Sequence, residues 1–274
     1  MRVGVVGAGG RMGREVCRTV LAREGLELAV AVDPAHGGAD LAGLLGVDAR
    51  RTGGAQVADG PDALVAAGAE VVVDFTHLEV ARATIGFCAD AGIHSVVGTT
   101  GFTEADLDEL AARFDPSTGV RAHCLVAANF AIGAVLMMRF AALAAPWFDS
   151  AEVIELHHAA KRDAPSGTSL RTAEGMAAAR AAAGRGDFPA DATDVVVVEG
   201  VRGGAGPGGV RMHSVRLPGL VAHQEVLFGA PGQGLTIRHD SFDRSSFMDG
   251  VVLAVQAVGD RPGLTVGIEP LLGI

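Results

Sequence analysis

This 274-residue sequence has no tyrosine, one tryptophan, three cysteines and no long uninterrupted apolar run. Its longest apolar stretches fall well short of the roughly 20 residues that a membrane-spanning helix needs. Cys17, Cys88 and Cys124 stand far apart, form no CxxC pair and lie in apolar patterns, so we expect buried, reduced thiols. The chain opens directly on an apolar strand pattern, without the charged segment or cleavage site of a secretory signal. We therefore expect a cytoplasmic protein with no membrane partner.

Positive charge is also in short supply. The chain has 22 Lys and Arg against 32 Asp and Glu, which gives a net charge of -10. An acidic surface repels phosphate backbones, so we expect no nucleic-acid partner, although a local cationic pocket is compatible with an acidic exterior. What the sequence does have is apolar residues. It is 49% hydrophobic and 20% charged, which predicts a well-filled core.

The first half of the chain alternates apolar strand patterns with helical patterns. Short β-branched runs predict five strands, at residues 2–7, 26–33, 70–75, 93–98 and 120–130. Helical spacing covers residues 11–24, and another helix is expected from about residue 103, where Thr103 is a suitable N-cap. Near-uninterrupted strands separated by helices are typical of a parallel sheet buried on both faces.

The pattern changes after about residue 150. Five further strands are predicted, at residues 151–158, 193–200, 211–217, 220–229 and 235–240. Only one strong helical pattern, at about 168–183, lies among them, and strands joined without helices suggest an open, mostly antiparallel sheet. Residues 200–210 contain six glycines in eleven and are predicted to form a flexible loop. A last helical pattern, at about 242–258, is placed to pack back on the first domain.

A glycine-rich turn, G-A-G-G-R-M-G at residues 7–13, joins the first strand to the first helix. Its glycines allow a tight turn and a close approach of the backbone to a pyrophosphate, while the helix start supplies N–H groups and a partial positive charge. Asp33 ends the next strand, where an acid that accepts hydrogen bonds from the adenosine ribose is expected. The turn, the helix and the acid together predict a dinucleotide-binding site; a purely structural turn is the alternative.

Asp33 favours NAD over NADP, because no arginine follows it to meet a 2′-phosphate. Arg11, in the glycine turn, partly offsets that absence, so we expect NADH to be used well and NADPH to be usable. Two further strand ends, D-F-T at 74–76 and G-T-T-G at 98–101, carry small residues and hydroxyls. They leave room for a nicotinamide ring at the sheet edge where open α/β sheets bind ligands.

A second cluster, E-L-H-H-A-A-K-R-D-A-P-S-G-T at residues 155–168, gathers two histidines, a lysine and a Ser-Gly-Thr turn. The period of two places Glu155 and His157 on one face of a strand and His158 on the other, so a regular strand would turn only one histidine toward a given site. Lys161 follows, and Ser166 is an ordinary helix-capping residue. Capping does not explain why histidines and a lysine lead into the same turn. We interpret the cluster as a site for proton transfer and for an anion.

These motifs together resemble the dihydrodipicolinate reductase (4-hydroxy-tetrahydrodipicolinate reductase) family, in its actinobacterial form. The matching pieces span nearly the whole chain: GAGGRMG (7–13), DFT (74–76), GTTGF (98–102), AANF (127–130), ELHHAAKRDAPSGT (155–168), HSVRLPGLVAHQEVLFG (213–229) and LTIRHDSFDRSSFMDGV (235–251). The resemblance implies an α/β protein with a Rossmann-type parallel-sheet nucleotide domain at residues 1–128 and 241–274. An inserted α+β domain with an open mixed or antiparallel sheet, residues 129–240, would bind the substrate and form a homotetramer.

The resemblance also implies a reaction and its residues. The reaction is the NAD(P)H-dependent reduction, with loss of water, of 4-hydroxy-tetrahydrodipicolinate, a small dicarboxylate of lysine and diaminopimelate synthesis, to tetrahydrodipicolinate. By resemblance His157 transfers the proton and Lys161 is its cationic partner, and no metal is expected. The substrate's carboxylates are expected to bind His158, Lys161, Ser166, Gly167 and Thr168. The cofactor, NADH or NADPH, is expected to contact Gly7, Ala8, Gly9, Gly10, Arg11, Met12, Asp33, Phe75, Thr76, Gly98, Thr99, Thr100, Ala127, Ala128, Asn129 and Phe130. Many relatives have proline in place of Ala128, and the 200–210 stretch is unusually rich in glycine.

Three other functions stay open from the residues alone. A semialdehyde dehydrogenase needs a thiolate nucleophile in a polar setting. A nucleotide-sensing protein would not need the 155–168 cluster. A zinc enzyme would draw ligands from histidines whose spacing fits no fixed pattern, namely His157, His158, His213, His223 and His239. The sequence also leaves open whether His157 or Lys161 delivers the proton.

Overall fold

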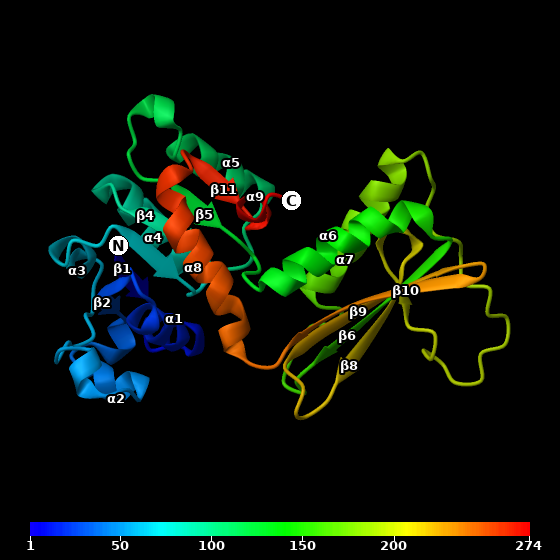
Figure 1. Cartoon of the computed structure of the whole chain (residues 1–274), viewed down its shortest axis with the longest axis horizontal. Coiled ribbons are helices and arrows are strands. Elements are labelled where there is room, and N and C mark those ends of the chain that lie inside the picture. The colour runs from blue at the N-terminus through cyan, green and yellow to red at the C-terminus, as the bar shows by residue number, and fades with distance from the viewer. The chain divides into compact units, whose positions relative to one another are not determined.

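The computed structural model describes residues 1–274, and the chain folds as two compact units. Unit 1 comprises residues 1–130 and 247–274, and unit 2 comprises residues 131–246. Each unit has a sheet of its own (Figure 1). The domain boundaries expected at 128/129 and 240/241 stay a prediction, whereas the compact units change over at 130/131 and 246/247.

Unit 1 is built on a six-stranded parallel sheet in the order β11-β5-β4-β3-β1-β2. Its strands are β1 (Arg2–Val6), β2 (Glu27–Val32), β3 (Val71–Asp74), β4 (His94–Val97), β5 (Cys124–Val126) and β11 (Leu264–Val266). The first four strands form where the sequence predicts them, but the strand expected over 120–130 is only three residues long. β3 is buried along its whole length, as a strand covered on both faces should be.

The helices of unit 1 are α1 (Arg11–Ala22), α2 (Leu41–Leu45), α3 (Asp62–Ala66), α4 (Leu78–Ala91), α5 (Glu104–Arg113), α8 (Met248–Ala257) and α9 (Glu269–Leu272). α5 begins where the sequence predicts, because Thr103 and Asp106 form a reciprocal capping box. α4 and α5 pack on the sheet through an apolar cluster that includes Ile85, Phe114 and Val97. α8 packs against α1 and β4, so the last part of the chain completes unit 1 (Figure 1).

Unit 2 contains a five-stranded sheet in the order β10-β9-β6-β8-β7. Its strands are β6 (Ser150–His157), β7 (Gly204–Ala205), β8 (Arg211–Arg216), β9 (Ala222–Ala230) and β10 (Gln233–Ser241). Only β6 and β8 pair in parallel; the other neighbours are antiparallel. Helices α6 (Ile132–Ala144) and α7 (Gly167–Ala182) pack together over the sheet, around a core that includes Val153, Met176 and Val226 (Figure 1). The predicted fold class, a Rossmann-type parallel sheet plus an α+β domain with an open mixed sheet, is confirmed.

The strand predicted at 193–200 is wrong. These residues are irregular, and the side chains of Val195 to Val198 are exposed. Four consecutive valines favour extended backbone, but a strand also needs a neighbour for its N–H and C=O groups, and this segment pairs with none. The 200–210 stretch is also less irregular than expected, because Gly204-Ala205 pairs with β8 as β7.

The end of the chain differs from the predicted helix over 242–258. A 3₁₀ turn occupies Arg244–Phe247, and α8 starts only at Met248. The three-residue strand β11 follows, and the sequence analysis did not predict it. Across the whole structure, every helix is too short or too polar to cross a bilayer.

Candidate active site

The glycine turn after β1 leads directly into α1. Gly7 has a φ of 74°, in the left-handed region that favours glycine, and its N–H donates to the carbonyl oxygen of Val32 at 2.8 Å. Gly10, the residue before α1, has no side chain with which to cap the helix. The N–H groups in the first turn of α1 therefore have no cap from that residue. This arrangement fits the diphosphate of a dinucleotide.

Gly13 allows α1 to pack closely on this turn, because a Cβ at that position would overlap the carbonyl oxygen of Gly7. We expect Gly13→Ala to displace the turn, to lower stability by about 1–3 kcal/mol as overpacking does, and to weaken NADH binding. Thermal unfolding and calorimetric titration with NADH measure the two effects. Gly60→Ala is the matched control, because a Cβ there meets nothing within 4 Å. Equal NADH affinity in the two variants would contradict a role for Gly13 in shaping the turn.

Asp33 follows β2, and its carboxylate is hydrogen-bonded to the glycine turn. Its Oδ2 accepts the N–H of Gly9 at 2.8 Å, and its Oδ1 accepts the N–H of Ala35 at 3.0 Å. Burial raises the pKa of Asp33, but hydrogen bonds from His36, Gly9 and Ala35 outweigh it and bring the pKa below its ordinary value of 3.8. The carboxylate is ionised at neutral pH and has lone pairs left to accept hydroxyl groups.

The ends of β3 and β4 are neighbours in the sheet, and they bring the D-F-T and G-T-T-G stretches together. Buried Asp74 accepts hydrogen bonds from the N–H and Oγ1 of Thr76, at 2.7 and 2.6 Å. The Oγ1 of Thr99 donates to the carbonyl oxygen of Thr76 at 3.1 Å. Asp74 begins the D-F-T stretch but was not among the expected cofactor contacts, and it shapes the turn that carries Phe75 and Thr76.

The segment after β5 lies against the same strand ends. The N–H of buried Ala127 donates to the carbonyl oxygen of Val97 at 3.0 Å, and the ring of buried Phe130 lies 5.5 Å from that of Phe75. Every residue expected to contact the cofactor is thus on unit 1, at or just after the carboxyl ends of β1 to β5. That edge is where open parallel sheets bind their ligands. The contacts themselves stay a prediction.

In unit 2, strand β6 carries the histidine cluster. The side chain of Glu155 is only 1% exposed, and His157 is the last residue of the strand. His158 follows the end of the strand and is exposed. The alternation of side chains between the two faces of a strand therefore does not fix its direction. Arg216, the last residue of β8, pairs directly with His157 across the sheet.

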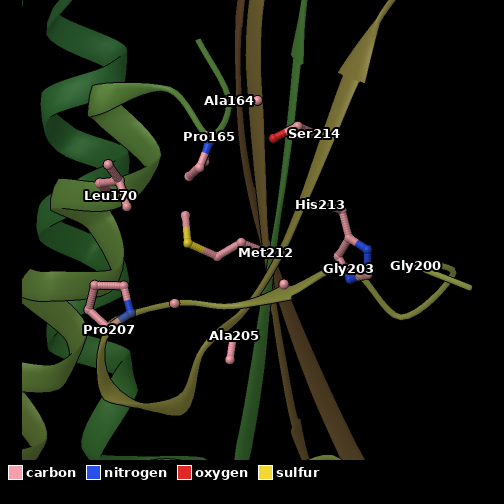
Figure 2. Close-up of a pocket in the computed structure, with 12 residues that line it drawn as sticks. Ala164, Pro165, Leu170, Gly200, Gly203, Ala205, Pro207, Met212, His213 and Ser214 are labelled. Carbon is pink, nitrogen blue, oxygen red and sulfur yellow. The ribbon is translucent and has the colours of Figure 1, made fainter.

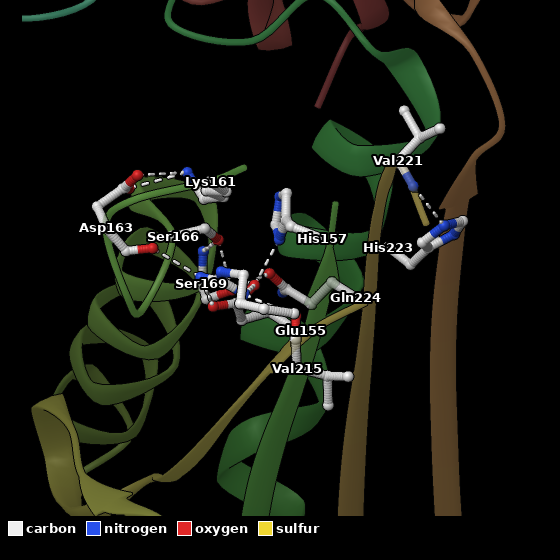
Figure 3. A network of polar contacts seen from close by, with 11 residues as sticks. Glu155, His157, Lys161, Asp163, Ser166, Ser169, Val215, Val221, His223 and Gln224 are labelled. Carbon is white, nitrogen blue, oxygen red and sulfur yellow. Dashed lines mark hydrogen bonds and ion pairs between the residues drawn. The ribbon is translucent and has the colours of Figure 1, made fainter. Parts of the chain in front are cut away.

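Glu155 is bonded to both of its neighbours. Its Oε2 contacts the Nδ1 of His157 (Figure 3). Arg216 donates from Nη1 to Oε2 at 2.8 Å and from Nη2 to Oε1 at 2.7 Å. The sequence analysis gave neither Glu155 nor Arg216 a role, although Glu155 begins the 155–168 cluster. The sequence did offer one indication of a role for Glu155. This acid lies on the same face of the strand as apolar Val153 and is buried with it.

The charge of Glu155 determines which nitrogen of His157 can exchange a proton. Burial raises the pKa of Glu155, but hydrogen bonds from His157, Arg216 and Ser214 outweigh it and hold the pKa at about 2. At neutral pH the carboxylate is therefore ionised and can only accept hydrogen bonds. The Nδ1 of His157 consequently carries a proton, and Nε2 is left as the atom that gains or loses one.

The same pKa predicts a loss of stability in acid. Glu155 has a pKa of about 2 in the folded protein, below its ordinary value of 4.5. Its contribution to stability is complete above the ordinary value and is lost as the pH falls through the folded value. Thermal unfolding measures stability at about pH 5 and about pH 3. Between these two pH values, stability should decrease less in Glu155→Gln than in the unmodified protein, although the variant is less stable at both. Equal decreases would contradict the lowered pKa.

Lys161, the only lysine in the chain, lies in the turn after β6. Its Nζ donates to both carboxylate oxygens of Asp163, at 2.9 and 2.8 Å, and this contact lowers the pKa of Asp163. The carbonyl oxygen of Asp163 accepts a hydrogen bond from the Nη2 of Arg216 at 2.7 Å. His157 and Lys161 are therefore the two ends of one chain of contacts through Glu155, Arg216 and Asp163.

The Ser166-Gly167-Thr168 turn starts α7, and Ser166 is its N-cap. The buried Oγ of Ser166 accepts the N–H of Ser169 at 3.2 Å, and the Oγ of Ser169 donates to Gln224 at 2.7 Å (Figure 3). The hydroxyl of Ser166 is thus engaged within the protein, whereas Gly167 is exposed at the helix start. The structure gives Ser166 a capping role, and its expected contact with substrate stays a prediction.

Unit 2 also has an open cavity of about 550 Å³ (Figure 2). It is bounded by the Ala164-Pro165 turn, Leu170 of α7, Met212 of β8 and residues of the 200–207 stretch. Neither the two histidines of the cluster nor Lys161 lines it, and the residues that do are mostly apolar or glycine. The cavity therefore has few of the residues expected to bind the substrate, and the expected binding at the polar cluster stays a prediction.

The cysteines are buried and unpaired, as the sequence predicts. Burial raises the pKa of the thiol to about 12 in Cys17, Cys88 and Cys124 alike. Thiols with so high a pKa are not nucleophiles at neutral pH. In the whole structure, no three side chains of His, Cys, Asp or Glu come together in a group that could hold a metal ion.

Comparison with known proteins gives the same family for both units. Residues 1–130 match the family model for the N-terminus of dihydrodipicolinate reductase, and residues 133–272 match the model for its C-terminus. The chain is 52% identical over 278 residues to a 4-hydroxy-tetrahydrodipicolinate reductase of Nocardia farcinica, covering 100% of this chain and 99% of the relative. A Mycolicibacterium vanbaalenii protein of the same name is 49% identical and is covered over 100% of both chains. The solved dipicolinate-bound dihydrodipicolinate reductase from Paenisporosarcina sp. TG-14 has a TM-score of 0.82 and 36% identity over 98% of each chain.

Proposed function

The chain belongs to the dihydrodipicolinate reductase family, and on this premise we propose that it reduces 4-hydroxy-tetrahydrodipicolinate to tetrahydrodipicolinate. The reaction uses a reduced nicotinamide dinucleotide, releases water and serves lysine and diaminopimelate synthesis. The observation that carries the proposal is the single network that joins His157 and Lys161 just before α7. The solved relative binds dipicolinate, a ring dicarboxylate, which supports a substrate of the same class.

The substrate brings two negative charges, which the polar cluster neutralises at short range. Lys161 supplies an ammonium group, and exposed His158 supplies a hydrogen-bond donor beside it in sequence. The start of α7 adds backbone N–H groups and the positive end of the helix dipole. Charge-assisted hydrogen bonds of this kind are stronger than neutral ones. A dicarboxylate therefore binds despite the acidic composition of the chain.

His157 provides the proton. When bound on unit 1, the reduced nicotinamide supplies a hydride, so the balanced reaction consumes one hydride and one proton and releases the 4-hydroxyl group as water. Hydride addition to an unsaturated imine-type ring builds negative charge, which a positioned acid must neutralise. The Nδ1 of His157 keeps its proton, which faces Glu155, so Nε2 takes up a proton from solvent and delivers it, which returns the ring to its neutral form. Lys161 holds a carboxylate and makes the ring more electrophilic.

Asp33 supports NADH as the preferred cofactor. Its carboxylate, which already receives the N–H groups of Gly9 and Ala35, accepts the adenosine ribose hydroxyls and repels a 2′-phosphate. Arg11 is exposed at the start of α1 and keeps NADPH usable. We therefore propose that both nicotinamides are substrates and that NADH has the higher kcat/KM.

The alternatives are weaker on specific grounds. A semialdehyde dehydrogenase needs a thiolate, and burial raises the pKa of all three cysteines to about 12. A sensor of nucleotides has no need for the His157–Glu155–Arg216 contacts. We extend the proposal to a cytoplasmic homotetramer, as the family resemblance implies; the exposed valines at 195–198 are apolar surface that a second copy can cover.

A coupled assay tests the proposed function. The upstream synthase generates the substrate in place, and the loss of nicotinamide absorbance is followed with NADH and with NADPH in parallel. We expect turnover with both cofactors and a higher kcat/KM for NADH. Absence of turnover with either cofactor would exclude the proposed reaction, and a clear NADPH preference would exclude the role given to Asp33.

A further inference from the structure

Glu155 has the environment of a residue that orients another residue. Its side chain is only 1% exposed, so a ligand that binds at the surface cannot contact it. One carboxylate oxygen, Oε2, is shared by the Nδ1 of His157 and the Nη1 of Arg216, and the other accepts the Nη2 of Arg216. Its two partners are His157, on the same strand, and Arg216, on the adjacent strand β8. Hydrogen bonds to both hold the buried carboxylate in one position in the sheet.

We infer that Glu155, braced by Arg216, is a positioning residue for the proposed reaction, because it fixes the ring and the tautomer of His157 and ties down the turn that carries Lys161. The inference rests on the proposed function and deepens it. The family resemblance gave roles to His157 and Lys161 but none to Glu155 or Arg216.

The tautomer argument depends on what a carboxylate can do. An ionised carboxylate only accepts hydrogen bonds, so the imidazole nitrogen that faces it must carry the proton. The ring of His157 therefore presents Nε2 on the side away from Glu155 (Figure 3). An amide in place of the carboxylate offers an N–H group to the same nitrogen, which favours the tautomer with its proton on Nε2. A neutral ring with its single proton on Nε2 would become an anion on delivering that proton, so this tautomer is a poor proton donor.

Arg216 extends this control to Lys161. Besides its two bonds to Glu155, its Nη2 donates to the carbonyl oxygen of Asp163 at 2.7 Å. The carboxylate of Asp163 receives the Nζ of Lys161 at 2.8 and 2.9 Å. The ion pair of buried Glu155 with half-buried Arg216 thus fixes the main chain between Lys161 and the start of α7.

The test is Glu155→Gln, which keeps the size of the side chain and removes its charge. We expect kcat to fall by about 10²-fold, the cost of a misplaced reacting group, while KM for the dicarboxylate changes little. Nitrogen NMR of the histidine rings, with His157 assigned by comparison with His157→Gln, should show that the proton of the neutral His157 ring moves from Nδ1 to Nε2. A folded Glu155→Gln variant with kcat within about threefold of the unmodified protein, or with an unchanged His157 tautomer, overturns the inference.

Glu152 provides a matched control on the same strand. It also binds a histidine and an arginine: the Nε2 of His213 lies 2.7 Å from its Oε2, and the Nη2 of Arg202 lies 2.6 Å from its Oε1. Glu152→Gln therefore removes the same kind of contact from β6 without touching His157. We expect its kcat to stay near that of the unmodified protein. An equal loss of kcat in the two variants would assign the effect to the strand as a whole and overturn the inference.

Glu155→Gln leaves half-buried Arg216 without its charged partner, so a second variant keeps the inference testable if Glu155→Gln does not fold. Glu155→Leu combined with Arg216→Met removes both charges, a change that folded proteins often tolerate. We expect this double variant to fold and to lose kcat at least as strongly as Glu155→Gln; full activity would overturn the inference. Failure of the proposed function is a separate result. It would show as an inactive unmodified protein, in which the NMR comparison still reports whether Glu155 sets the tautomer.

Discussion

Replacing His157 with glutamine is expected to lower kcat by about 10² to 10⁴, the usual cost of losing an acid–base group. Glutamine keeps polar atoms near Glu155 but has no group that titrates near neutral pH. Because His157 is the last residue of β6 and only 15% of its side chain is exposed, the substitution should leave the strand intact. Cofactor binding, which we assign to unit 1, should be unchanged.

Steady-state kinetics in the coupled assay and calorimetric titration with NADH measure these two effects. His213→Gln is the control, since His213 also contacts a glutamate of β6 and lies outside the proposed network. We expect that variant to keep its kcat. A loss of less than about threefold in His157→Gln would remove this residue from proton transfer and leave Lys161 as the remaining candidate.

Replacing Lys161 with alanine is expected to lower kcat to a similar extent and also to raise KM for the dicarboxylate. Lys161 differs from His157 in that it binds a carboxylate as well as activating the ring, so its loss affects binding and catalysis together. Its present partner, the carboxylate of Asp163, is 65% exposed and therefore well solvated without it. The substitution leaves no buried charge unpaired, so we expect little loss of stability.

The neighbouring cation supplies the comparison. Arg162→Ala removes an exposed positive charge one residue away, and we expect only a small rise in KM from the weaker local field. A second comparison, Lys161→Arg, keeps the charge but replaces a compact ammonium group with a planar one. We expect it to recover substrate binding more fully than kcat. Unchanged kcat and KM in Lys161→Ala would exclude the residue from the site.

The sequence predicted unit 1 well, because its signals are local. Uninterrupted apolar runs define β1 to β4, and the glycine turn, the helix start and Asp33 lie at fixed offsets from them. The histidine–lysine cluster was predicted for the same reason, since all its members lie within fourteen residues. Thr103 even marked the first turn of α5 correctly.

What the sequence did not predict depends on residues far apart in the chain. Arg216 lies 61 residues from Glu155, and only the parallel pairing of β6 with β8 brings them together. The strand β11 is three residues long and exists because β5 offers it an edge. The valines at 195–198 show the reverse case, in which strong strand propensity fails because no partner strand is present.

Unit 1 is assembled from both ends of the chain, and this has a consequence for biosynthesis. A nascent polypeptide that has reached residue 246 contains the whole of unit 2 but lacks α8, β11 and α9. Until residues 247–274 emerge from the ribosome, β5 has no β11 beside it and α1 lacks its contact with α8. Unit 2, although it is encoded within unit 1, is therefore complete in the chain before unit 1 is.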